Sequence, residues 1–217
     1  GLPESRVWAS LPPGQLVSGL SDPVLVADVM GLPAGDDAEP PTPDTGPAPW
    51  PARLGNRTWT RCEAGQHWVQ DGVRFDFLHP LPALYTGKTA SNNLFCVLWV
   101  RGATSSALLT GDMDATHEAA LVQAHPDVQA DWLLAPHHGS RTSSSPAFVA
   151  ATRPPHVLMA RGRYNPFGHP HAEVLARYRE AGAKVHDTAL QGAIRIELGA
   201  QRPALHWRQQ GGFWQEK

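Results

Sequence analysis

The sequence lacks three features that would each point to a particular class of protein. It has no run of about 18 apolar residues, so we expect no membrane span within it. It opens with Gly1-Leu2-Pro3, without a charged segment or an initiator methionine, so we expect no signal peptide and a chain cut from something longer. It has no positive excess either, because the formal net charge is −2, and any contact with nucleic acid must be local.

Cysteine is also scarce, with only Cys62 and Cys96 in the chain. Two cysteines are too few for a disulfide framework or a cysteine-based metal site. They could form one bridge, but we expect two separate thiols.

Glycine and proline are abundant, with 20 and 21 residues, which suggests many loops or a flexible insertion. Residues 33–56 are rich in proline and acidic side chains and offer little to bury. We expect a disordered or surface insertion there, and its simplest interpretation is a linker without function.

The remaining elements follow an order typical of an α/β fold. Asp71-Gly72 between alternating apolar positions predicts a hairpin, and further strands are expected at 93–101 and 107–110. Helices and strands then alternate, which indicates a mixed sheet with helices packed on it. The expected later elements are helices at 114–124, 144–152 and 170–181 and strands at 132–135, 156–160, 184–187, 193–198 and 204–208.

The stretch 108–145 holds the residues best placed for chemistry. Two buried runs, ending at Leu109 and Ala135, read as strands that are followed by Asp112 and by His137-His138. The carboxyl edge of such a sheet is where ligands bind, and neighbouring strands lie only about 4.8 Å apart. A carboxylate and an imidazole delivered there could share a metal ion, and Zn²⁺, Mn²⁺ or Fe would suit them.

Each of these residues also has an ordinary interpretation. A lone Gly-Asp is usually a turn, and Asp114 is expected to cap the following helix. A single histidine is usually a surface residue, whereas a pair between Pro136 and Gly139 after a buried run favours a pocket more strongly. Five histidines lie outside both this stretch and the 168–171 motif: His67, His79, His156, His186 and His206. We expect none of them to have a role in a site. The same expectation holds inside the stretch for His117 and His125.

Loops near this edge carry groups that suit a phosphate. Gly168-His169-Pro170-His171 opens a helix, where backbone N–H groups attract anions, although the motif could be only a cap. Arg141, Arg161 and Arg163 would make a locally positive rim suited to phosphodiesters. Ser140 and the nearby hydroxyls up to Ser145 could donate to phosphate oxygens, or they could form a solvated loop.

Several motifs together resemble those of one known family, the ComEC family of DNA-internalisation competence proteins, in its C-terminal metallo-β-lactamase-like domain. The resemblance covers roughly Arg57 to Leu198, and residues 1–13 fit the segment after that family's first metal motif. The motifs are Leu109-Thr110-Gly111-Asp112, the run from Ala135 to Ser145, Gly168-His169-Pro170-His171 with Glu173-Val174-Leu175, Cys62-x-Ala64-Gly65-Gln66 with Asp71-Gly72-Val73-x-Phe75, and Asn92-Asn93.

The resemblance implies an αββα sandwich with a metal site at one edge, here incomplete at the N-terminus, over residues 1–217. It implies a parent protein of the bacterial inner membrane, with this domain soluble and on the periplasmic side, joined to a transmembrane channel domain. The parent would pass one DNA strand inward, and the hydrolase-like domain would degrade the other strand, from single-stranded or double-stranded DNA.

The resemblance also implies roles for individual residues. Asp112 would bridge metal ions and His137 would be a metal ligand, with Zn²⁺ or Mn²⁺ as the ion. His138 and His171 would join Asp112 in catalysis by steadying the leaving oxygen. Substrate contacts would come from the remaining positions of the pocket rim, which are Asn93 (or Asn92), Ser140, Arg141 and His169.

One departure from the family pattern limits these expectations. The family's main metal motif, H-x-D-x-D-H, is absent from the 217 residues. Because catalytic metal sites usually use three or more protein ligands, we expect this chain alone to bind metal weakly and to lack nuclease activity. Two other functions stay open: a metallohydrolase of small esters or lactones, and an inactive domain that only guides DNA.

Overall fold

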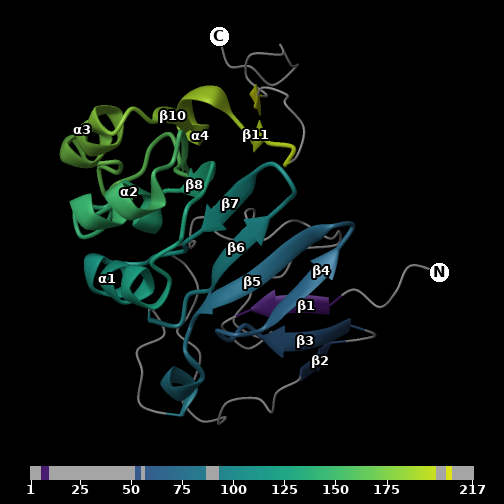
Figure 1. Cartoon of the computed structure of the whole chain (residues 1–217). Coiled ribbons are helices and arrows are strands. Elements are labelled where there is room, and N and C mark those ends of the chain that lie inside the picture. The colour runs from purple at the N-terminus through teal and green to yellow at the C-terminus, as the bar shows by residue number, and fades with distance from the viewer. Residues whose placement is uncertain (1–5, 10–51, 55–56, 87–92, 199–203, 207–217) are drawn as a thin grey trace.

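The computed structural model describes residues 6–9, 52–54, 57–86, 93–198 and 204–206, which form an α/β fold around a mixed seven-stranded sheet (Figure 1). The spatial order of its strands is β10-β9-β8-β7-β6-β5-β4. Neighbours from β4 to β7 run antiparallel, and those from β7 to β10 run parallel. The strands are β4 (His67–Gln70), β5 (Val73–His79), β6 (Val97–Arg101), β7 (Ser106–Leu109), β8 (Trp132–Leu134), β9 (His156–Met159) and β10 (Lys184–Asp187).

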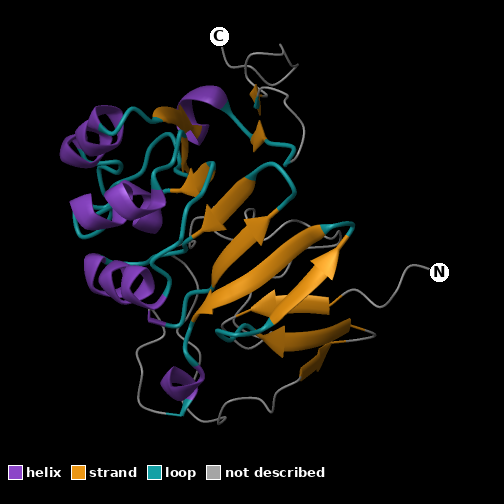
Figure 2. Ribbon diagram, viewed as in Figure 1, coloured by secondary structure: helices purple, strands orange, loops and turns teal. Residues whose placement is uncertain are grey.

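Helices stand together on one side of this sheet (Figure 2). The three that stand together are α1 (Ala115–Ala124), α2 (Pro146–Thr152) and α3 (Ala172–Glu180). The described residues also form a short α4 (Thr188–Gln191) and the 3₁₀ turns η2 (Pro82–Tyr85) and η4 (Pro136–Gly139). A small sheet, β1 (Arg6–Ala9), β3 (Arg57–Arg61) and β2 (Ala52–Leu54), lies near β4 and β5. Among the residues described here, no helix has the length and apolar character to cross a membrane.

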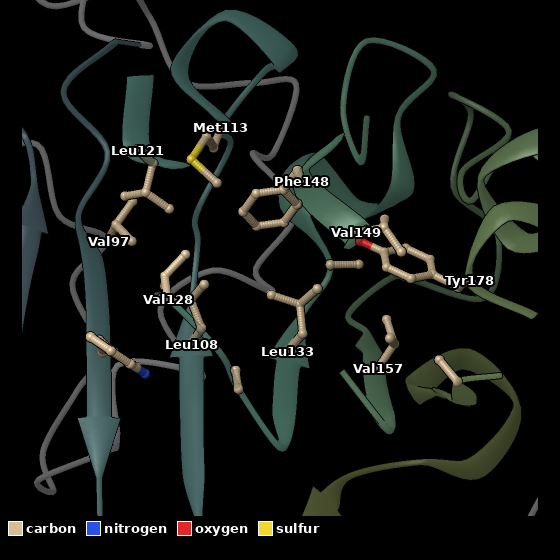
Figure 3. Packing of buried hydrophobic residues seen from close by; sticks show 14 of the residues in the cluster. Val97, Leu108, Met113, Leu121, Val128, Leu133, Phe148, Val149, Val157 and Tyr178 are labelled. Carbon is tan, nitrogen blue, oxygen red and sulfur yellow. The ribbon is translucent and has the colours of Figure 1, made fainter. Parts of the chain in front are cut away.

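Both faces of the central sheet are buried, which strand β6 makes clear. Its side chains alternate, so Val97 and Trp99 join the cluster under the helices, while Leu98 and Val100 join a cluster on the opposite face. Figure 3 shows the helix-side cluster, in which Leu121 and Phe148 pack on Leu108 and Leu133. Each such fully buried side chain contributes about 1.5–3 kcal/mol. A sheet covered on both faces is consistent with the expected metallo-β-lactamase-like α/β sandwich.

Local signals in the sequence placed most elements correctly. Asp71 and Gly72 have φ values of 52° and 77°, which a tight hairpin turn between β4 and β5 requires. Asp114 caps α1 by accepting hydrogen bonds from the backbone N–H groups of Thr116 and His117, both at 3.0 Å. Ser145 caps α2 in the same way.

The structure differs from the expected elements in several places. The strand expected at 93–101 begins only at Val97, and the strand expected at 193–198 is only β11 (Ile194–Arg195). β11 pairs antiparallel with β12 (Leu205–His206), and residues 207–208 of the expected last strand lie outside the described residues. Most of the expected insertion at 33–56 lies outside the described residues, but Ala52–Leu54 within it forms β2. The expected insertion therefore does not extend over 52–54, because β2 pairs with β3.

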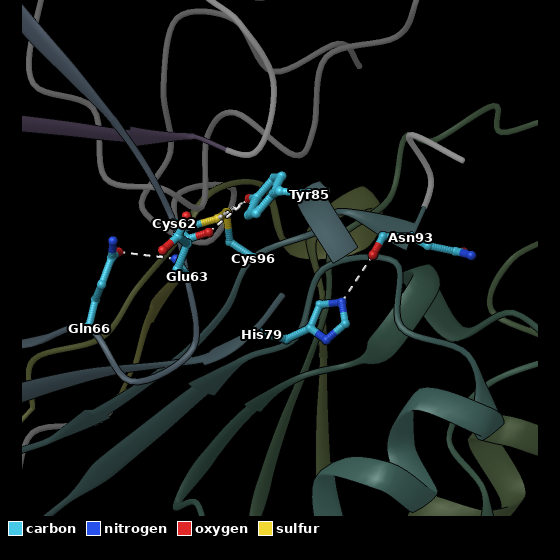
Figure 4. The surroundings of a disulfide bond; sticks show 7 residues. All are labelled: Cys62, Glu63, Gln66, His79, Tyr85, Asn93 and Cys96. Atoms are coloured by element: carbon cyan, nitrogen blue, oxygen red, sulfur yellow. Dashed lines mark hydrogen bonds between the residues drawn. A yellow bond between two sulfur atoms is a disulfide. The ribbon is translucent and has the colours of Figure 1, made fainter. Parts of the chain in front are cut away.

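The expectation of two separate thiols is wrong, because Cys62 and Cys96 form a disulfide (Figure 4). Their Cα atoms lie 6.1 Å apart, where the end of β3 meets the segment leading into β6. Tyr85 holds the same corner by donating a hydrogen bond of 2.8 Å to the Cys62 carbonyl. Closing a loop of 34 residues stabilises the fold by about 3–4 kcal/mol in the chain-entropy account. Sheet topology creates this proximity, and the spacing of the cysteines did not show it.

Candidate active site

Loops that follow β7, β8 and β9 meet at the carboxyl edge of the parallel strands. The backbone N–H of His137 donates to the carbonyl of Gly111 at 3.0 Å, which joins the first two loops. The N–H of His171 donates to the carbonyl of Gly139 at 3.0 Å, which adds the start of α3. Strand order therefore brings Asp112 and the four histidines of the two motifs to one place.

The backbone of η4 is held in an uncommon conformation. His137 and His138 have φ values of 48° and 55°, in the left-handed region that costs an ordinary residue about 1–2 kcal/mol. Gly139 follows with φ of 81°, and a Cβ atom there would lie 2.6 Å from Cβ of Pro170. Only glycine fits at this contact, so the turn presses against the start of α3. Strain of this kind gathers at functional sites.

Asp112 faces His138 rather than any other histidine for which the structure gives a contact. The Nδ1 atom of His138 lies 2.7 Å from the carbonyl oxygen of Ala160. A carbonyl only accepts hydrogen bonds, so Nδ1 carries a proton, and in the neutral ring the lone pair of Nε2 is free. That Nε2 atom lies 3.5 Å from Oδ1 of Asp112. Two acceptors so close together favour a proton or a metal ion between them.

His137 lies beside the other two histidines with one ring atom unsatisfied. Its Nδ1 is buried and has no hydrogen-bond partner. Its ring centroid lies 5.8 Å from that of His169, which in turn lies 5.3 Å from that of His171. Partial burial, and then the neighbouring imidazoles, lower the pKa of His169, against an opposing effect of Asp112. His169 is therefore held neutral, the form that binds metals.

These residues fit a divalent metal ion only in part. Two ligand atoms on one tetrahedral ion, each about 2.0–2.2 Å from it, lie roughly 3.3–3.6 Å apart, which matches the separation of Asp112 and His138. The orphaned Nδ1 of His137 is a further donor of the right kind. Within the described part of the chain, however, no three His, Cys, Asp or Glu side chains converge on one ion position.

The residues expected to contact the substrate differ in their exposure to solvent. Arg141 is exposed at the rim and pairs with Glu173 at 2.9 Å. Asn93 is also exposed, and its backbone carbonyl accepts a hydrogen bond of 3.0 Å from His79. Ser140 is buried, and its hydroxyl lies 3.1 Å from that of Thr142, so it shapes the loop instead of lining an open rim.

The serine run also has a structural role, and the expectation of a solvated loop is wrong for its buried members. Ser143 and Ser144 are buried, and the hydroxyl of Ser143 donates to the carbonyl of Pro136 at 2.8 Å. The backbone N–H groups of Ser144 and Ser145 donate to the buried carboxyl group of Glu118 on α1. Burial raises the pKa of Glu118, against the hydrogen bonds from Ser145 and Ser144. This contact ties the histidine loop to α1.

Sequence reasoning missed a second group of rings beside Asp112. His79 stacks on Phe95 with ring centroids 4.3 Å apart, and His117 meets both rings edge-on. The turn at Gly111 passes over Phe95, because a Cβ on Gly111 would lie 3.0 Å from Cβ of Phe95. Burial lowers the pKa of His79, against its hydrogen bond with Asn93. A signal was present, since His79 also closes a buried strand.

The fold and this edge define a class: an α/β sandwich with histidines and a carboxylate gathered at one edge of its sheet. Comparisons with known proteins then narrow the class. Over 143 residues the chain is 33% identical to Recombination protein 2 of Haemophilus influenzae, which is 66% of this chain and 18% of that protein. Over 160 residues it is 35% identical to Competence protein ComA of Neisseria gonorrhoeae, or 71% of this chain and 22% of that protein.

A third relative is ComE operon protein 3 of Bacillus subtilis, 31% identical over 117 residues, with 54% of this chain and 15% of that protein covered. No family model matches the chain. The chain belongs to the ComEC family of competence proteins. It spans about a fifth of the length of the first two relatives.

Proposed function

We propose that this chain is the hydrolase-like part of a DNA-uptake protein, in which the carboxyl-edge site hydrolyses the DNA strand that is not transported. The observation that carries the proposal is the Asp112 carboxylate facing Nε2 of His138 across 3.5 Å. A carboxylate and an imidazole nitrogen at that separation suit metal-assisted phosphodiester hydrolysis. The names of the relatives, a recombination protein and a competence protein, support DNA as the substrate.

The residues of this chain would share the work as follows. A divalent ion, Zn²⁺ or Mn²⁺, would supply an activated water and positive charge for the phosphate. Asp112 and His138 would hold that ion. The ligand role expected of His137, through its orphaned Nδ1, would need a second ion position, since no three such side chains of the described residues converge on one. His138 thus moves from the leaving-group role expected from the sequence to a ligand role. His171, whose side chain makes no cap hydrogen bond in α3, would steady the leaving oxygen.

The remaining ligands would come from an H-x-D-x-D-H motif outside these 217 residues. On that basis the chain by itself binds metal weakly and lacks nuclease activity, since catalytic sites usually need three or more protein ligands.

We propose a periplasmic position for the domain, in a parent protein of the inner membrane that also supplies the channel. The support is the Cys62–Cys96 disulfide, because such bonds persist in oxidising compartments and are rare in the bacterial cytosol. The test is thiol labelling of the parent protein in cells. Labelling of Cys62 and Cys96 only after reduction would support the proposal, and free thiols without reduction would contradict it.

The test of the nuclease uses a protein that carries the H-x-D-x-D-H motif ahead of this domain. Asp112→Ala should abolish cleavage of labelled DNA and leave the circular-dichroism spectrum unchanged. The matched control is Asp127→Ala, at an exposed aspartate in the turn after α1, which should keep full cleavage.

Other outcomes of that assay would assign the domain differently. Cleavage that survives Asp112→Ala would remove this residue from the mechanism. Hydrolysis of small esters or lactones without DNA cleavage would indicate another metallohydrolase. DNA binding with steep salt dependence and no cleavage would indicate a guiding module.

A further inference from the structure

The loop between β9 and α3 presents two large aromatic rings to solvent. In this segment, residues 161–168, which we name the aromatic loop, Tyr164 is 85% exposed and Phe167 is 73% exposed. Isolated exposed apolar side chains are common and need no explanation. These two share one short loop, and that loop leads directly into His169 and His171.

Hydrogen bonds and an ion pair hold both ends of the aromatic loop to neighbouring residues. The side-chain amide of Asn165 donates to the carbonyl of His169 at 2.9 Å and accepts from the N–H of the same residue at 2.9 Å. At the other end, the N–H of Arg161 donates to the hydroxyl of Thr188 at 2.9 Å, and its guanidinium pairs with Asp187 at 2.7 Å. The loop that carries the two rings is therefore fixed at both ends.

The rings form a row that reaches the candidate active site. Phe167 stacks on His169, with ring centroids 5.8 Å apart and planes 28° from parallel. His169 then contacts His171 and His137 at 5.3 and 5.8 Å. A ligand lying on Phe167 would have its next atoms beside the histidines.

Positive charge accompanies Tyr164, the other exposed ring of the aromatic loop. The guanidinium carbon of Arg163 lies 5.8 Å from the ring centroid of Tyr164. Exposed aromatic rings with an arginine beside them bind single-stranded nucleic acid, because bases stack on the rings and the cation meets the backbone. Bases inside a duplex are already stacked on one another, so the rings would discriminate in favour of unpaired bases.

We propose that the aromatic loop binds the unpaired bases of single-stranded DNA through Tyr164 and Phe167, and so leads the strand to the histidine cluster. This inference rests on the proposed function in taking DNA as the substrate. It adds the strandedness of the substrate and the residues that read it.

The experiment measures fluorescence anisotropy of the 217-residue chain with three labelled probes. These are a short oligothymidine, an abasic strand with the same number of phosphates, and a duplex of the same length. The variants are Tyr164→Ala with Phe167→Ala, and the aromatic swap Tyr164→Phe with Phe167→Tyr. The matched control is Leu190→Ala on α4, which removes another exposed apolar side chain, 70% exposed in the wild type.

We expect the wild type to prefer oligothymidine over the abasic strand. The double alanine variant should lose at least about tenfold in affinity for oligothymidine, since each stacked base contributes appreciably. Its affinity for the abasic strand should not change, and the aromatic swap and Leu190→Ala should behave as wild type.

The outcomes separate the inference from the proposed function. If the wild type binds DNA but the double alanine variant binds oligothymidine equally well, the inference fails and the proposed function stands. If the wild type binds the abasic strand and oligothymidine equally well, the inference again fails and the proposed function stands. If the wild type binds none of the probes, the inference fails, and the proposed function is then judged by the cleavage assay on the protein that carries the H-x-D-x-D-H motif.

Discussion

Two groups of histidines lie at different levels of the parallel strands, and they differ in what their ring nitrogens meet. At the carboxyl ends, Asp112 faces His138, and His137 keeps a buried ring nitrogen without a partner. At the amino end of β9, Nδ1 of His156 lies 3.2 Å from Nε2 of His186 on β10, and Trp132 stacks on His156 with centroids 4.2 Å apart. The first group places a carboxylate beside an imidazole nitrogen, whereas the second joins two rings by a hydrogen bond beside tryptophan.

The comparison teaches that backbone setting, rather than residue type, separates the two groups of histidines. His156 opens β9 with a partly buried ring, and His186 lies inside β10 with a buried ring, so regular strand geometry fixes both. His137 and His138 lie in a turn with left-handed backbone angles, which presents adjacent side chains to one edge. The regular strand conformation of His156 and His186 carries no backbone strain. The left-handed conformation of His137 and His138 is strained, and such strain gathers at functional sites.

The largest expected effect is on stability, from Gly139→Ala. A Cβ atom there would meet Pro170 at 2.6 Å in a left-handed conformation, so we expect a loss of roughly 2–5 kcal/mol in the free energy of unfolding. The matched control is Gly182→Ala, which has the same φ of 81° and nothing within 4 Å. Urea denaturation measures both, and equal losses would mean that the turn does not press on α3.

A second substitution pair separates the two histidine groups. His186 is 1% exposed, so His186→Ala should cost about 2–4 kcal/mol through the cavity it leaves. His138→Ala should cost only about 1 kcal/mol, because the ring is partly exposed and loses one hydrogen bond. Thermal or urea unfolding gives both values. A larger loss at His138 than at His186 would make the carboxyl-edge group the structural one.

The smallest effect is a dependence of stability on pH from the amino-end group. Partial burial, and then Lys184, lower the pKa of His156, against the opposing effect of Asp131. A base with a lowered pKa takes up its proton first in the unfolded chain, so its contribution is present above about pH 6.5 and is lost as the pH falls.

The free energy of unfolding of the wild type should therefore decrease more between neutral and mildly acidic pH than that of His156→Gln. Denaturation at a series of pH values measures the difference. Parallel curves for the two proteins would remove His156 as the cause.

The sequence predicted the parts of this molecule that depend on local patterns. The Asp71-Gly72 hairpin, the Asp114 cap and the strand that ends before Asp112 follow from residue preferences over a few positions. The meeting of Asp112 with the histidine loop followed from strand order, because parallel neighbours end at one edge.

The sequence could not reveal features that depend on distant contacts. The Cys62–Cys96 bridge needs the three-dimensional path of β3 and β6. The serine run has a polar sequence that suggested exposure, but several of its serines are buried and its backbone N–H groups bind Glu118 on α1. Asp112 pairs with His138 and not with His137 because the carbonyl of Ala160, far away in the sequence, holds Nδ1 of His138 and so turns its Nε2 toward Asp112.

The central claim is that metal binding belongs to the carboxyl-edge histidines and Asp112, and that this chain supplies only part of the site. A calorimetric titration of the 217-residue chain with Zn²⁺ tests it, with Asp112→Asn and His156→Gln as the two variants. We predict weak binding by the wild type that disappears in Asp112→Asn and is unchanged in His156→Gln. Tight stoichiometric binding by the wild type, or binding that survives Asp112→Asn and is lost in His156→Gln, would contradict the claim.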